Sequence, residues 1–591
     1  MDSSPPDARQ REASPSASSS AAASASAPEA APAPAPAPPR ARGLVRLHAG
    51  DYRGIEGRPV EVQVDLLRRG QPRFQIVGLP GKSTRESRER IETAIRNSGF
   101  RVPPARVLVH LAPATQEKDG AGFDLPIALG VLLAAGVVRA GGALAVTASE
   151  RGDADAAPGE SGGSREPGVA RSAAAAFEDV GFLGELGLEG EVRAVRGAVL
   201  IADAMAKRGA RRVVVPSDNA GEVALLDGIE IFAVSHLREA VDLLARGGTP
   251  MARNGTPYGP VAGPGSTPLD GLDFAEVRGQ EATKRGLLIA AAGGHNVLLS
   301  GPPGVGKTML ARRFPSVLPD LGVDAAMDVL RVRSVVEGDC GFRLSLRPPL
   351  RAPHHTISYA GLVGGGVRLT PGEVSRAHRG VLFLDEFPEF APRVLEALRE
   401  PLEEGSITVG RACGSLTFPA EFQLLAAMNP CPCGYRGHPR RRCRCTPRQV
   451  EMYQRRLSGP LRDRLDVFLQ VAALEPARVI GAPAAGNELD SSSMRTAVGR
   501  ARERQAARWG ARVTNARVAL SRLLAPASMP PSALERLRQR AERLSLSARA
   551  FGRTARVART IADLAAAERV APDDIDLALL YRESLDACAV D

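Results

Sequence analysis

Short apolar runs alternate with longer amphipathic stretches between about residues 271 and 480. Three of these runs have the length and composition of buried strands: His295–Ser300, Val381–Leu384 and Phe422–Ala427. A regular alternation of strands and helices favours a parallel sheet with helices on both faces. The pattern therefore predicts an α/β fold class for this region, with a doubly wound core at 271–480.

The hydrophobic pattern between about residues 43 and 246 predicts a separate, mixed α/β domain. Three short runs are typical of strands: Val107–Leu111, Val180–Leu183 and Arg212–Val215. The longer apolar run Leu125–Val138 is typical of a buried helix. Ser83 and Glu86 have the spacing of a capping box at the start of another helix, and Gly99 has the position of its stop signal.

From about residue 490 the pattern is almost wholly helical. Arg549–Ala567 is the longest predicted helix and Asp573–Arg582 is the last. Residues 490–591 are therefore expected to form a helical C-terminal domain.

Three segments lack the periodicity of folded structure. Residues 1–42 are a monotonous mixture of Ala, Ser and Pro, which buries too little apolar surface to offset the entropy of folding. Residues 149–171 resemble a low-complexity surface insertion, and the Gly-, Pro- and Thr-rich residues 247–270 an interdomain linker. We expect a disordered tail, an insertion and a linker at these places.

The formal net charge is +11, from 77 Lys and Arg against 66 Asp and Glu. An arginine-rich coding bias accounts for this excess as readily as attraction to a polyanion such as nucleic acid does. No run reaches the roughly 18 apolar residues of a membrane span, and the N-terminus lacks the pattern of a signal peptide. The expected location is the cytoplasm.

The most specific motif follows the first of the strand-like runs and fits the pattern G-x-x-x-x-G-K-[ST]. Its residues are Gly301, Pro302, Pro303, Gly304, Val305, Gly306, Lys307 and Thr308. In such a loop the glycines let backbone N–H groups close around phosphates, the lysine reaches the β- and γ-phosphates, and the hydroxyl binds Mg²⁺. The motif predicts an ATPase that uses ATP and Mg²⁺.

Two carboxylates, Asp385 and Glu386, follow the apolar run Val381–Leu384. At the carboxyl end of a central strand they are expected beside the loop of a neighbouring strand, where ligands gather. Asp385 then suits Mg²⁺ binding, and Glu386 suits activation of the attacking water.

Asn429 follows the third strand-like run, where its amide can orient a water near the γ-phosphate or simply serve the turn before Pro430. Several arginines between Arg455 and Arg464 precede a further strand. A guanidinium from this segment can stabilise the transition state in a neighbouring subunit's site. Spacing alone does not choose among these arginines.

Four of the seven cysteines lie within fifteen residues, at Cys431, Cys433, Cys443 and Cys445. Such clustering indicates a metal site rather than a disulfide framework, and four thiolates can complete a tetrahedral zinc site. The C-x-C spacing is tighter than the usual C-x₂-C, so free thiols in a loop remain the alternative. Eight arginines against one acid between Arg436 and Arg456 make this loop a candidate DNA-contacting surface.

Over roughly residues 43–590 the chain resembles the magnesium-chelatase-like AAA+ ATPases of the ComM/YifB group. The segments that carry the resemblance are Val77–Pro80, Arg85–Arg90, Phe123–Gly130, Arg351–Thr356 and Met428–Gly434. The resemblance implies a AAA+ core, a helical lid and a ribosomal-S5/Lon-like N-terminal domain.

The same resemblance implies roles for single residues. Asn429 corresponds to the first sensor, Arg464 to the arginine finger that acts in trans, and Arg549 to the lid sensor. Arg553 and Arg556 lie on the same predicted helix and keep the choice of lid sensor open.

The resemblance also implies a β-hairpin inserted into the second helix of the core, at about Thr356–Val367, and a second hairpin at about Ser406–Phe418. Arg368 and Arg411 would then either contact DNA in the pore of a ring or be solvated hairpin residues. His354 and His355 suggest metal, but structural roles in the insert are the favoured interpretation.

The Lon-like N-terminal domain raises the question of proteolysis. Gly122 stands where a Lon-like enzyme would have its nucleophilic Ser, and Ala198–Leu200 occupies the region of the partner Lys. The sequence therefore argues against peptidase activity.

The leading functional hypothesis is a hexameric DNA motor that migrates branches or unwinds duplex in the recombination of incoming DNA. The alternative is an ATPase subunit of a magnesium chelatase that remodels a partner protein or a metal-insertion complex. Asp490–Met494 comes near the D-x-S-x-S motif of a chelatase adhesion module but has Met in the last position. A third interpretation, a scaffold without turnover, is disfavoured by the intact Lys307, Asp385 and Glu386.

Overall fold

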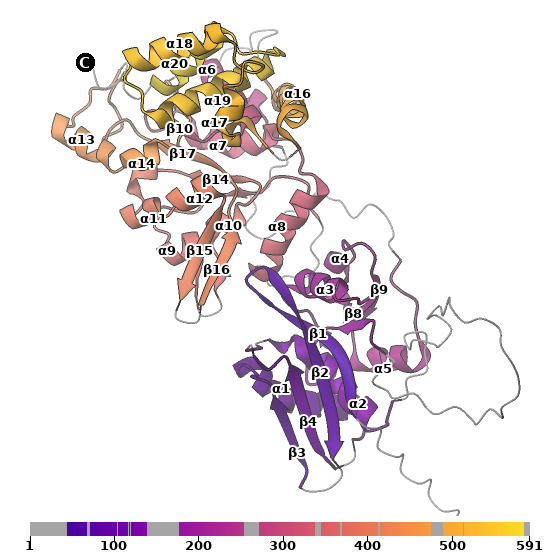
Figure 1. The fold of residues 1–591 in the computed structure, drawn as a ribbon. Helices are drawn as coiled ribbons and strands as arrows, with labels where there is room; N and C mark the ends of the chain where they lie inside the picture. Colours follow the sequence, from indigo (N-terminus) through magenta and orange to yellow (C-terminus); the bar gives the residue numbers. More distant parts are fainter. Residues whose placement is uncertain are drawn as a thin grey trace, which may run out of the picture. The chain divides into compact units, whose positions relative to one another are not determined.

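The computed structural model describes residues 44–67, 71–102, 104–115, 117–118, 120–138, 177–252, 271–336, 344–366, 369–411, 414–438, 440–473, 489–511 and 513–583 (Figure 1). The predicted tail at 1–42, the insertion at 149–171 and the linker from residue 253 onward lie outside the described residues.

The N-terminal region contains a mixed sheet of seven strands in the order β3-β4-β2-β1-β5-β8-β9. Its strands are β1 (Val45–Arg53), β2 (Glu56–Leu67), β3 (Arg73–Val77), β4 (Arg106–Ala112), β5 (Val180–Phe182), β8 (Arg212–Pro216) and β9 (Glu230–Val234). A short pair is formed by β6 (Glu185–Leu186) and β7 (Val192–Arg193). The helices are α1 (Lys82–Asn97), α2 (Asp124–Ala134), α3 (Ala198–Lys207), α4 (Ser217–Val223) and α5 (Leu237–Arg246). The predicted mixed α/β composition is confirmed.

The start of α1 differs from the predicted capping box. Gly81 is the N-cap residue and no side chain caps the helix, so Ser83 and Glu86 lie inside its first turns. The backbone N–H of Gly81 is held by the Lys118 carbonyl at 2.7 Å, and the Thr84 hydroxyl donates to the same carbonyl at 3.0 Å. A tertiary contact therefore sets the helix start, while Gly99, at φ +84°, ends the helix as predicted.

One buried ion pair joins α1 to α2. Both Nε and Nη2 of Arg90 donate to Oδ2 of Asp124, at 3.0 and 2.9 Å, and the carboxylate is fully buried. Burial raises the pKa of Asp124 to about 6, although hydrogen bonds from Ser87 and Arg90 oppose this rise. Two segments that carry the family resemblance are thus structural partners.

The second sheet has five parallel strands in the order β11-β14-β17-β10-β18. They are β10 (Val297–Ser300), β11 (Leu350–Arg351), β14 (Val381–Leu384), β17 (Gln423–Met428) and β18 (Val467–Gln470). The predicted parallel sheet is confirmed. The first strand begins two residues later than predicted because the backbone N–H groups of His295 and Asn296 donate to the Ala290 carbonyl and to Oδ2 of Asp466.

The two faces of this sheet belong to two hydrophobic cores. Val297 and Leu299 pack into one core with residues of the C-terminal helices. Leu298 and Leu384 pack into the other with residues of the inserted segments. All four residues of β10 and of β14 are buried, as expected of a parallel sheet covered on both sides.

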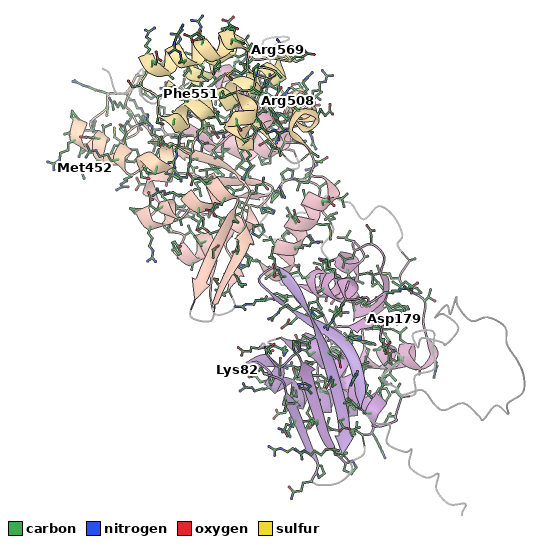
Figure 2. All side chains as sticks on the ribbon, viewed as in Figure 1. Lys82, Asp179, Met452, Arg508, Phe551 and Arg569 are labelled. Atoms are coloured by element: carbon green, nitrogen blue, oxygen red, sulfur yellow. The ribbon has the colours of Figure 1, made fainter. Side chains whose placement is uncertain are left out.

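The helices of this region are α6 (Glu281–Gly293), α7 (Lys307–Arg313), α8 (Val323–Val336), α9 (Tyr359–Val363), α10 (Glu373–Arg376), α11 (Pro392–Glu396), α12 (Arg399–Glu404), α13 (Pro447–Arg455) and α14 (Gly459–Arg462). Met452 of α13 is 63% exposed to solvent. Figure 2 labels its position.

Two antiparallel pairs lie between β11 and β17. The first consists of β12 (Gly364–Gly365) and β13 (Thr370–Pro371), so it is shorter and lies later in the chain than the predicted hairpin. The second consists of β15 (Ser406–Arg411) and β16 (Gly414–Pro419), as the sequence predicts. Arg368 and the side chain of Arg411 lie outside the described part of the chain.

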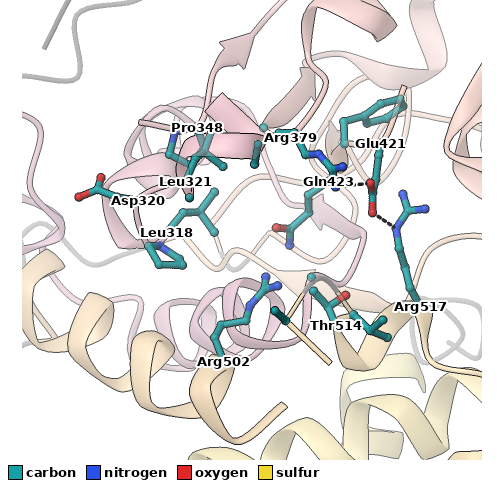
Figure 3. A pocket seen from close by; sticks show the side chains of 18 of the residues that line it. Leu318, Asp320, Leu321, Pro348, Arg379, Glu421, Gln423, Arg502, Thr514 and Arg517 are labelled. Atoms are coloured by element: carbon teal, nitrogen blue, oxygen red, sulfur yellow. Dashed lines mark hydrogen bonds and ion pairs between the residues drawn. The ribbon is translucent and has the colours of Figure 1, made fainter. Parts of the chain in front are cut away.

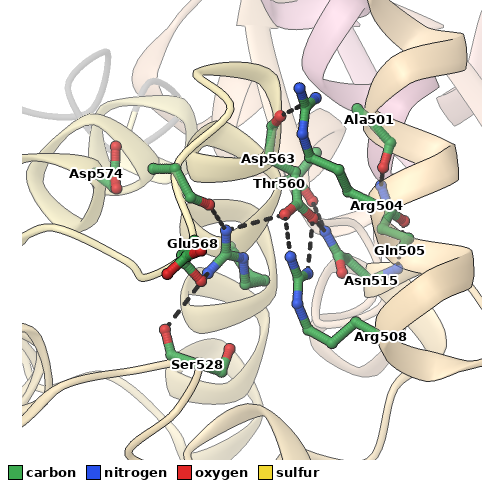
Figure 4. Close-up of polar contacts among 12 residues, drawn as sticks. Ala501, Arg504, Gln505, Arg508, Asn515, Ser528, Thr560, Asp563, Glu568 and Asp574 are labelled. Atoms are coloured by element: carbon green, nitrogen blue, oxygen red, sulfur yellow. Dashed lines mark hydrogen bonds and ion pairs between the residues drawn. The ribbon is translucent and has the colours of Figure 1, made fainter.

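The C-terminal helices are α16 (Ser491–Trp509), α17 (Leu520–Leu523), α18 (Pro531–Arg543), α19 (Ala548–Leu564) and α20 (Pro572–Glu583). Asp563 of α19 lies fully buried at the centre of their polar contacts (Figure 4). Its carboxylate accepts hydrogen bonds from Arg508 at 2.8 Å, Arg559 at 2.9 Å and Asn515 at 2.8 Å. This network joins α16 to α19 and satisfies a charge that burial alone would make costly.

Among the helices that the structure describes, none is long and apolar enough to cross a membrane.

Candidate functional site

The phosphate-loop motif connects β10 to α7. Gly304 and Gly306 have φ values of +78° and +94°, a region that side chains with a Cβ atom rarely adopt. The last backbone N–H groups of the loop and the first of α7 are the groups that bind phosphate in such motifs. The predicted motif therefore has the expected strand–loop–helix context.

The Lys307 ammonium is buried inside this loop. It donates to the carbonyl oxygens of Gly301 and Pro302, at 2.7 and 2.8 Å, and to Oδ1 of Asn429 at 2.9 Å. Burial lowers the pKa of Lys307, while the nearby Asp385 and Glu386 carboxylates oppose this effect. The structure thus brings together the predicted lysine and the predicted sensor asparagine, which are far apart in the sequence.

Thr308 and Asp385 also meet. The Thr308 hydroxyl donates to Oδ2 of Asp385 at 2.5 Å, although the two residues belong to different strand–loop units. A hydroxyl and a carboxylate at hydrogen-bond distance are the oxygen ligands that Mg²⁺ takes in nucleotide sites. These two residues therefore fit a Mg²⁺ ion by their donor chemistry.

Glu386 is exposed and has a left-handed backbone, with φ +51°. Its N–H donates to Oδ1 of Asp385 at 2.9 Å, which fixes the turn after β14. Nδ1 of His355 lies 3.2 Å from Oε2 of Glu386, and the His355 ring packs against that of His354 with centroids 4.1 Å apart. The sequence did not predict this contact between the insert and the predicted base.

Asn429 follows β17, which lies between β10 and β14 in the sheet. This order places Asn429 between the phosphate loop and the acidic pair, because parallel strands end at the same edge. The Asn429 amide oxygen accepts a hydrogen bond from Lys307, so Asn429 contacts the phosphate loop.

The arginines predicted as finger and lid sensor share one carboxylate. Nη2 atoms of Arg464 and Arg549 lie 2.5 and 3.5 Å from Oε1 of Glu403. Arg464 is only 5% exposed, whereas Arg549 is 56% exposed. Within one subunit these guanidinium groups are therefore held by α12, in a contact that the sequence did not predict.

The two other lid candidates are committed to structural contacts. Arg553 forms an ion pair with Asp466, which is fully buried, and this contact helps to keep the pKa of Asp466 below its usual range despite burial. Arg556 donates two hydrogen bonds to the Val518 carbonyl, both at 3.1 Å. Of the three arginines, Arg549 is the one with an exposed side chain.

The four clustered cysteines converge on one point. Their Sγ atoms all lie within 4.8 Å of one another, and three pairs are 3.4–3.6 Å apart. A zinc ion with Zn–S bonds of about 2.3 Å requires sulfurs about 3.8 Å apart in a tetrahedron. The donor set therefore fits zinc in number, chemistry and spacing.

Backbone groups favour the thiolate form at one of these sulfurs. Hydrogen bonds from the N–H groups of Arg444 and Tyr435 lower the pKa of Cys433 to about 6, whereas burial raises that of Cys431 to about 12. The metal-binding form of a cysteine is the thiolate, so these backbone hydrogen bonds favour metal binding by Cys433.

The cysteine loop touches the phosphate loop. Gly434, at φ +81°, packs so closely on Pro303 that a Cβ atom there would lie 2.6 Å from its Cδ. Cys431 is also only two residues from Asn429. The cysteine cluster is thus attached to the nucleotide site at two points.

The surface of this loop is strongly basic. Seven of the eight arginines noted in the sequence are exposed: Arg440, Arg441, Arg442, Arg444, Arg448, Arg455 and Arg456. Arg441 lies over the Tyr435 ring at 5.1 Å and donates to its hydroxyl at 2.7 Å. Arg455 and Arg456 pair with Glu451 and Glu389, at 2.6 and 2.9 Å. The exposed arginines make this loop suited to contact phosphates.

The N-terminal domain contains a buried lysine that sequence reasoning missed. The Lys118 ammonium donates to the carbonyl oxygens of Gly78, Leu111 and Pro113, and burial lowers its pKa. In the part of the chain that the structure describes, no hydroxyl group bonds to this ammonium. Lys118 therefore has the contacts of a structural residue, not those of a Ser–Lys dyad.

Three family models match the chain. "Magnesium chelatase, subunit ChlI" matches residues 273–479, "Magnesium chelatase, subunit ChlI C-terminal" matches 488–582, and "Subunit ChlI of Mg-chelatase" matches 60–149. The matches cover the phosphate loop, the acidic pair and the C-terminal helices described above.

Several curated proteins are similar over nearly their whole length. The YifB protein of Salmonella typhimurium is 37% identical over 540 residues, which are 91% of this chain and 97% of that protein. An uncharacterized protein of Mycobacterium tuberculosis is 39% identical over 90% of this chain and 97% of its own. The competence protein ComM of Haemophilus influenzae is 36% identical over 90% of this chain and 95% of its own.

Proposed function

Because the chain belongs to the magnesium-chelatase-like ComM/YifB family of AAA+-type ATPases, we propose that it is an ATP-hydrolysing motor that acts on DNA as a ring. The proposed ring is a hexamer, and the proposed work is helicase or branch-migration activity in the recombination of incoming DNA. The observation that supports ATP hydrolysis most strongly is the 2.5 Å contact between Thr308 and Asp385, beside the buried Lys307.

In this proposal each residue of the nucleotide site has its own role in ATP hydrolysis. Lys307 binds the β- and γ-phosphates, and Thr308 and Asp385 hold Mg²⁺, which when bound neutralises charge on the phosphates. Glu386 accepts a proton from the attacking water, and Asn429 orients that water. His355, 3.2 Å from Glu386, positions the base.

Two arginines are assigned to the subunit boundary. Arg464 is proposed as the finger that reaches a neighbouring subunit's nucleotide, and Arg549 as the lid sensor. Support for Arg549 comes from its exposure, because Arg553 and Arg556 are occupied by internal contacts. Glu403 holds both proposed residues in a single subunit, so assembly must exchange this partner for phosphate.

Zinc is proposed to be bound by Cys431, Cys433, Cys443 and Cys445. It would hold the basic loop in one conformation, which lowers the entropy lost when the loop meets DNA. The exposed arginines of the loop support a phosphate-backbone contact. The name of the Haemophilus relative, competence protein ComM, is the further support for DNA as the substrate.

A magnesium-chelatase type of function is the second candidate. The matching family models are named after a chelatase subunit, and this is the observation that favours it. A chelatase subunit would remodel a protein partner, so DNA would leave its ATP turnover unchanged. The cysteine cluster and its basic surface favour the DNA hypothesis.

The deciding experiment is an ATPase assay with and without single-stranded DNA and four-way-junction DNA, over a range of salt concentrations. We expect DNA to stimulate turnover and binding to weaken steeply with salt. A variant with Arg440, Arg441 and Arg442 replaced by Gln should lower the slope of log K against log salt by about one per lost phosphate contact. Its matched control replaces three arginines of α18, Arg536, Arg538 and Arg543, by Gln. If DNA neither stimulates ATP turnover by the intact protein nor binds it in a salt-sensitive way, the DNA proposal is wrong.

A further inference from the structure

A cavity of about 300 Å³ lies at the amino edge of the five-stranded sheet (Figure 3). Gly294, Gly380 and Gln423 line it, and these residues stand just before or at the start of β10, β14 and β17. Because the strands are parallel, this edge is opposite the phosphate loop, which follows the carboxyl end of β10. The cavity is therefore separate from the nucleotide site.

The other walls come from the segment before α8 and from the C-terminal helical region. Leu318 and Leu321 line one side, and residues of α16 and of the segment Val513–Arg517 line another. The Asp320 carboxylate at this wall is paired with Arg495 at 2.6 Å. A ligand in the cavity would thus contact the sheet domain and the helical domain together.

Three arginines line this cavity, and two of them share one carboxylate. Nη1 of Arg379 and Nε of Arg517 lie 2.5 and 3.3 Å from the two carboxylate oxygens of Glu421. Figure 3 marks these contacts of Glu421 with dashed lines. Arg379 also reaches Asp328 at 3.3 Å. Its Nε atom, however, is buried and has no hydrogen-bond partner.

Arg502 is the third arginine and points from α16 toward the cavity (Figure 3). Its Nη2 donates to the Ala291 carbonyl at 2.8 Å, but its Nε is buried without a partner. Among the described residues no carboxylate forms an ion pair with it. Burial lowers the pKa of Arg502 to about 10, with no charged neighbour contributing to this shift.

The end of α6 offsets only part of this charge. A helix C-terminus carries about half a negative charge, and Ala291 lies in the last turn of α6. The two carbonyls on either side, those of Ala290 and Ala292, already accept from Gln423 and Gln505, both at 2.9 Å. Arg502 is partly buried, and a guanidinium group partly removed from water without a full counter-charge is destabilising, so an anion in the cavity would lower that cost.

We propose that this cavity is a binding site for a small phosphate-bearing anion, with Arg502 as its principal ligand and Arg379 as a second. Guanidinium groups present paired N–H donors that match phosphate oxygens, and Arg502 lines the cavity without a carboxylate partner among the described residues. The volume is at the small end of ligand sites and exceeds what one phosphate needs, so it admits pyrophosphate or a mononucleotide. The bound anion adds contacts between α16 and the sheet domain.

The test needs a protein whose phosphate loop no longer competes for the probe. In the full-length Lys307→Ala variant, without Mg²⁺, pyrophosphate is titrated by calorimetry, and inorganic phosphate and AMP are titrated in parallel. We expect saturable binding of at least one probe, and an affinity at least tenfold weaker when Arg502→Gln is added. Arg500→Gln, an exposed arginine on the same helix outside the cavity, should leave the affinity unchanged. Comparison of the three probes tells whether the site takes phosphate alone, a diphosphate or a nucleotide.

Thermal melting keeps the test decisive if Arg502 also has a structural role. Pyrophosphate should raise the melting temperature of Lys307→Ala but not that of Lys307→Ala/Arg502→Gln. The double variant without ligand should melt no lower than its parent, because a partly buried charge without a carboxylate partner has been removed. Absence of saturable binding in Lys307→Ala, or equal affinity with and without Arg502, would overturn the proposal. A lower melting temperature in Arg502→Gln with no ligand effect in either protein would leave Arg502 as a cap of α6 only.

Discussion

The two edges of the five-stranded sheet both gather buried charged groups, but they balance them differently. At the carboxyl edge, the Lys307 ammonium has three oxygen partners and two carboxylates nearby. At the amino edge, Arg379 and Arg517 share Glu421, Arg379 also pairs with Asp328, and Arg502 has only a helix end. The carboxyl edge is thus complete before any ligand binds, whereas the amino edge has a surplus of positive charge.

The two edges also differ in how the sequence encodes them. Residues of the carboxyl edge come from contiguous motifs, such as Gly301–Thr308, that carry their own backbone requirements. The charged residues of the amino edge come from three separate segments of the chain, at Arg379, Glu421 and Arg502. A candidate phosphate-binding edge can therefore be recognised from a motif in one case and only from the folded structure in the other.

The largest expected effect is the loss of turnover from one substitution at the carboxyl edge. Glu386→Gln should lower kcat for ATP by about 10²–10⁴-fold, the range of general acid–base catalysis, and should leave ATP binding intact. The measurement is steady-state ATP hydrolysis together with binding of a fluorescent ATP analogue. Glu389→Gln, an exposed carboxylate in the same turn, is the matched control and should retain turnover. Hydrolysis at the normal rate in Glu386→Gln would remove this residue from the mechanism.

The sequence predicted the parts of the molecule that local rules determine. The strand Val381–Leu384 was predicted with its bounds, and the helices α19 and α20 to within three residues at each end, because buried runs have a clear period. The start of α1 was missed because the Lys118 carbonyl, not a local cap, fixes it.

Contacts between distant segments account for what the sequence could not provide in the candidate site. The phosphate loop, the acidic pair and the cysteine cluster were found from their spacing. The contact of His355 with Glu386 and the shared partner Glu403 depend on the tertiary fold, and no spacing rule predicts them. The two orphaned N–H groups of the amino edge are visible only once burial is known.

The second prediction concerns pH and the amino edge. His378 is 4% exposed, and its Nδ1 accepts the Glu421 N–H at 3.0 Å. Burial, with Arg379 next, lowers the pKa of His378 to about 4; Asp328 opposes this shift and Arg517 adds to it. Since the folded pKa lies below the unfolded value of about 6.5, this group's contribution to stability is fully present above pH 6.5 and is lost as the pH falls toward 4.

At pH 5 the loss of unfolding free energy that comes from His378 is about 2 kcal/mol, because each pKa unit corresponds to about 1.36 kcal/mol. Urea unfolding at pH 7 and pH 5, followed by the fluorescence of the single tryptophan, Trp509, measures it. His378→Gln, which cannot take up a proton, should show a smaller decrease between these pH values than the unsubstituted protein. If the free energy of unfolding decreases equally in the two proteins, protonation of His378 does not cause the loss of stability at low pH.

The smallest expected effect tests how far the carboxyl edge extends into the cysteine loop. Gly434 and Gly437 both have left-handed backbones, at φ +81° and +73°, so an alanine costs about 1–2 kcal/mol of local strain at either position. A Cβ atom at Gly434 would lie 2.6 Å from Cδ of Pro303, whereas a Cβ atom at Gly437 would meet nothing within 4 Å. The two substitutions therefore share the backbone strain and differ in the contact with the phosphate loop.

Gly434→Ala should raise the KM for ATP roughly fivefold or more, because a displacement of about 1 Å in a positioning contact can cost on the order of 100-fold in rate. Gly437→Ala should leave KM close to its original value. Zinc content, measured on both purified variants, should remain equal, so that a difference in KM reports the contact and not the loss of the metal. If both variants raise KM alike, strain in the cysteine loop is responsible and the loop acts on ATP binding as a whole. If neither does, the phosphate loop tolerates the displacement, and the carboxyl edge ends at Asn429.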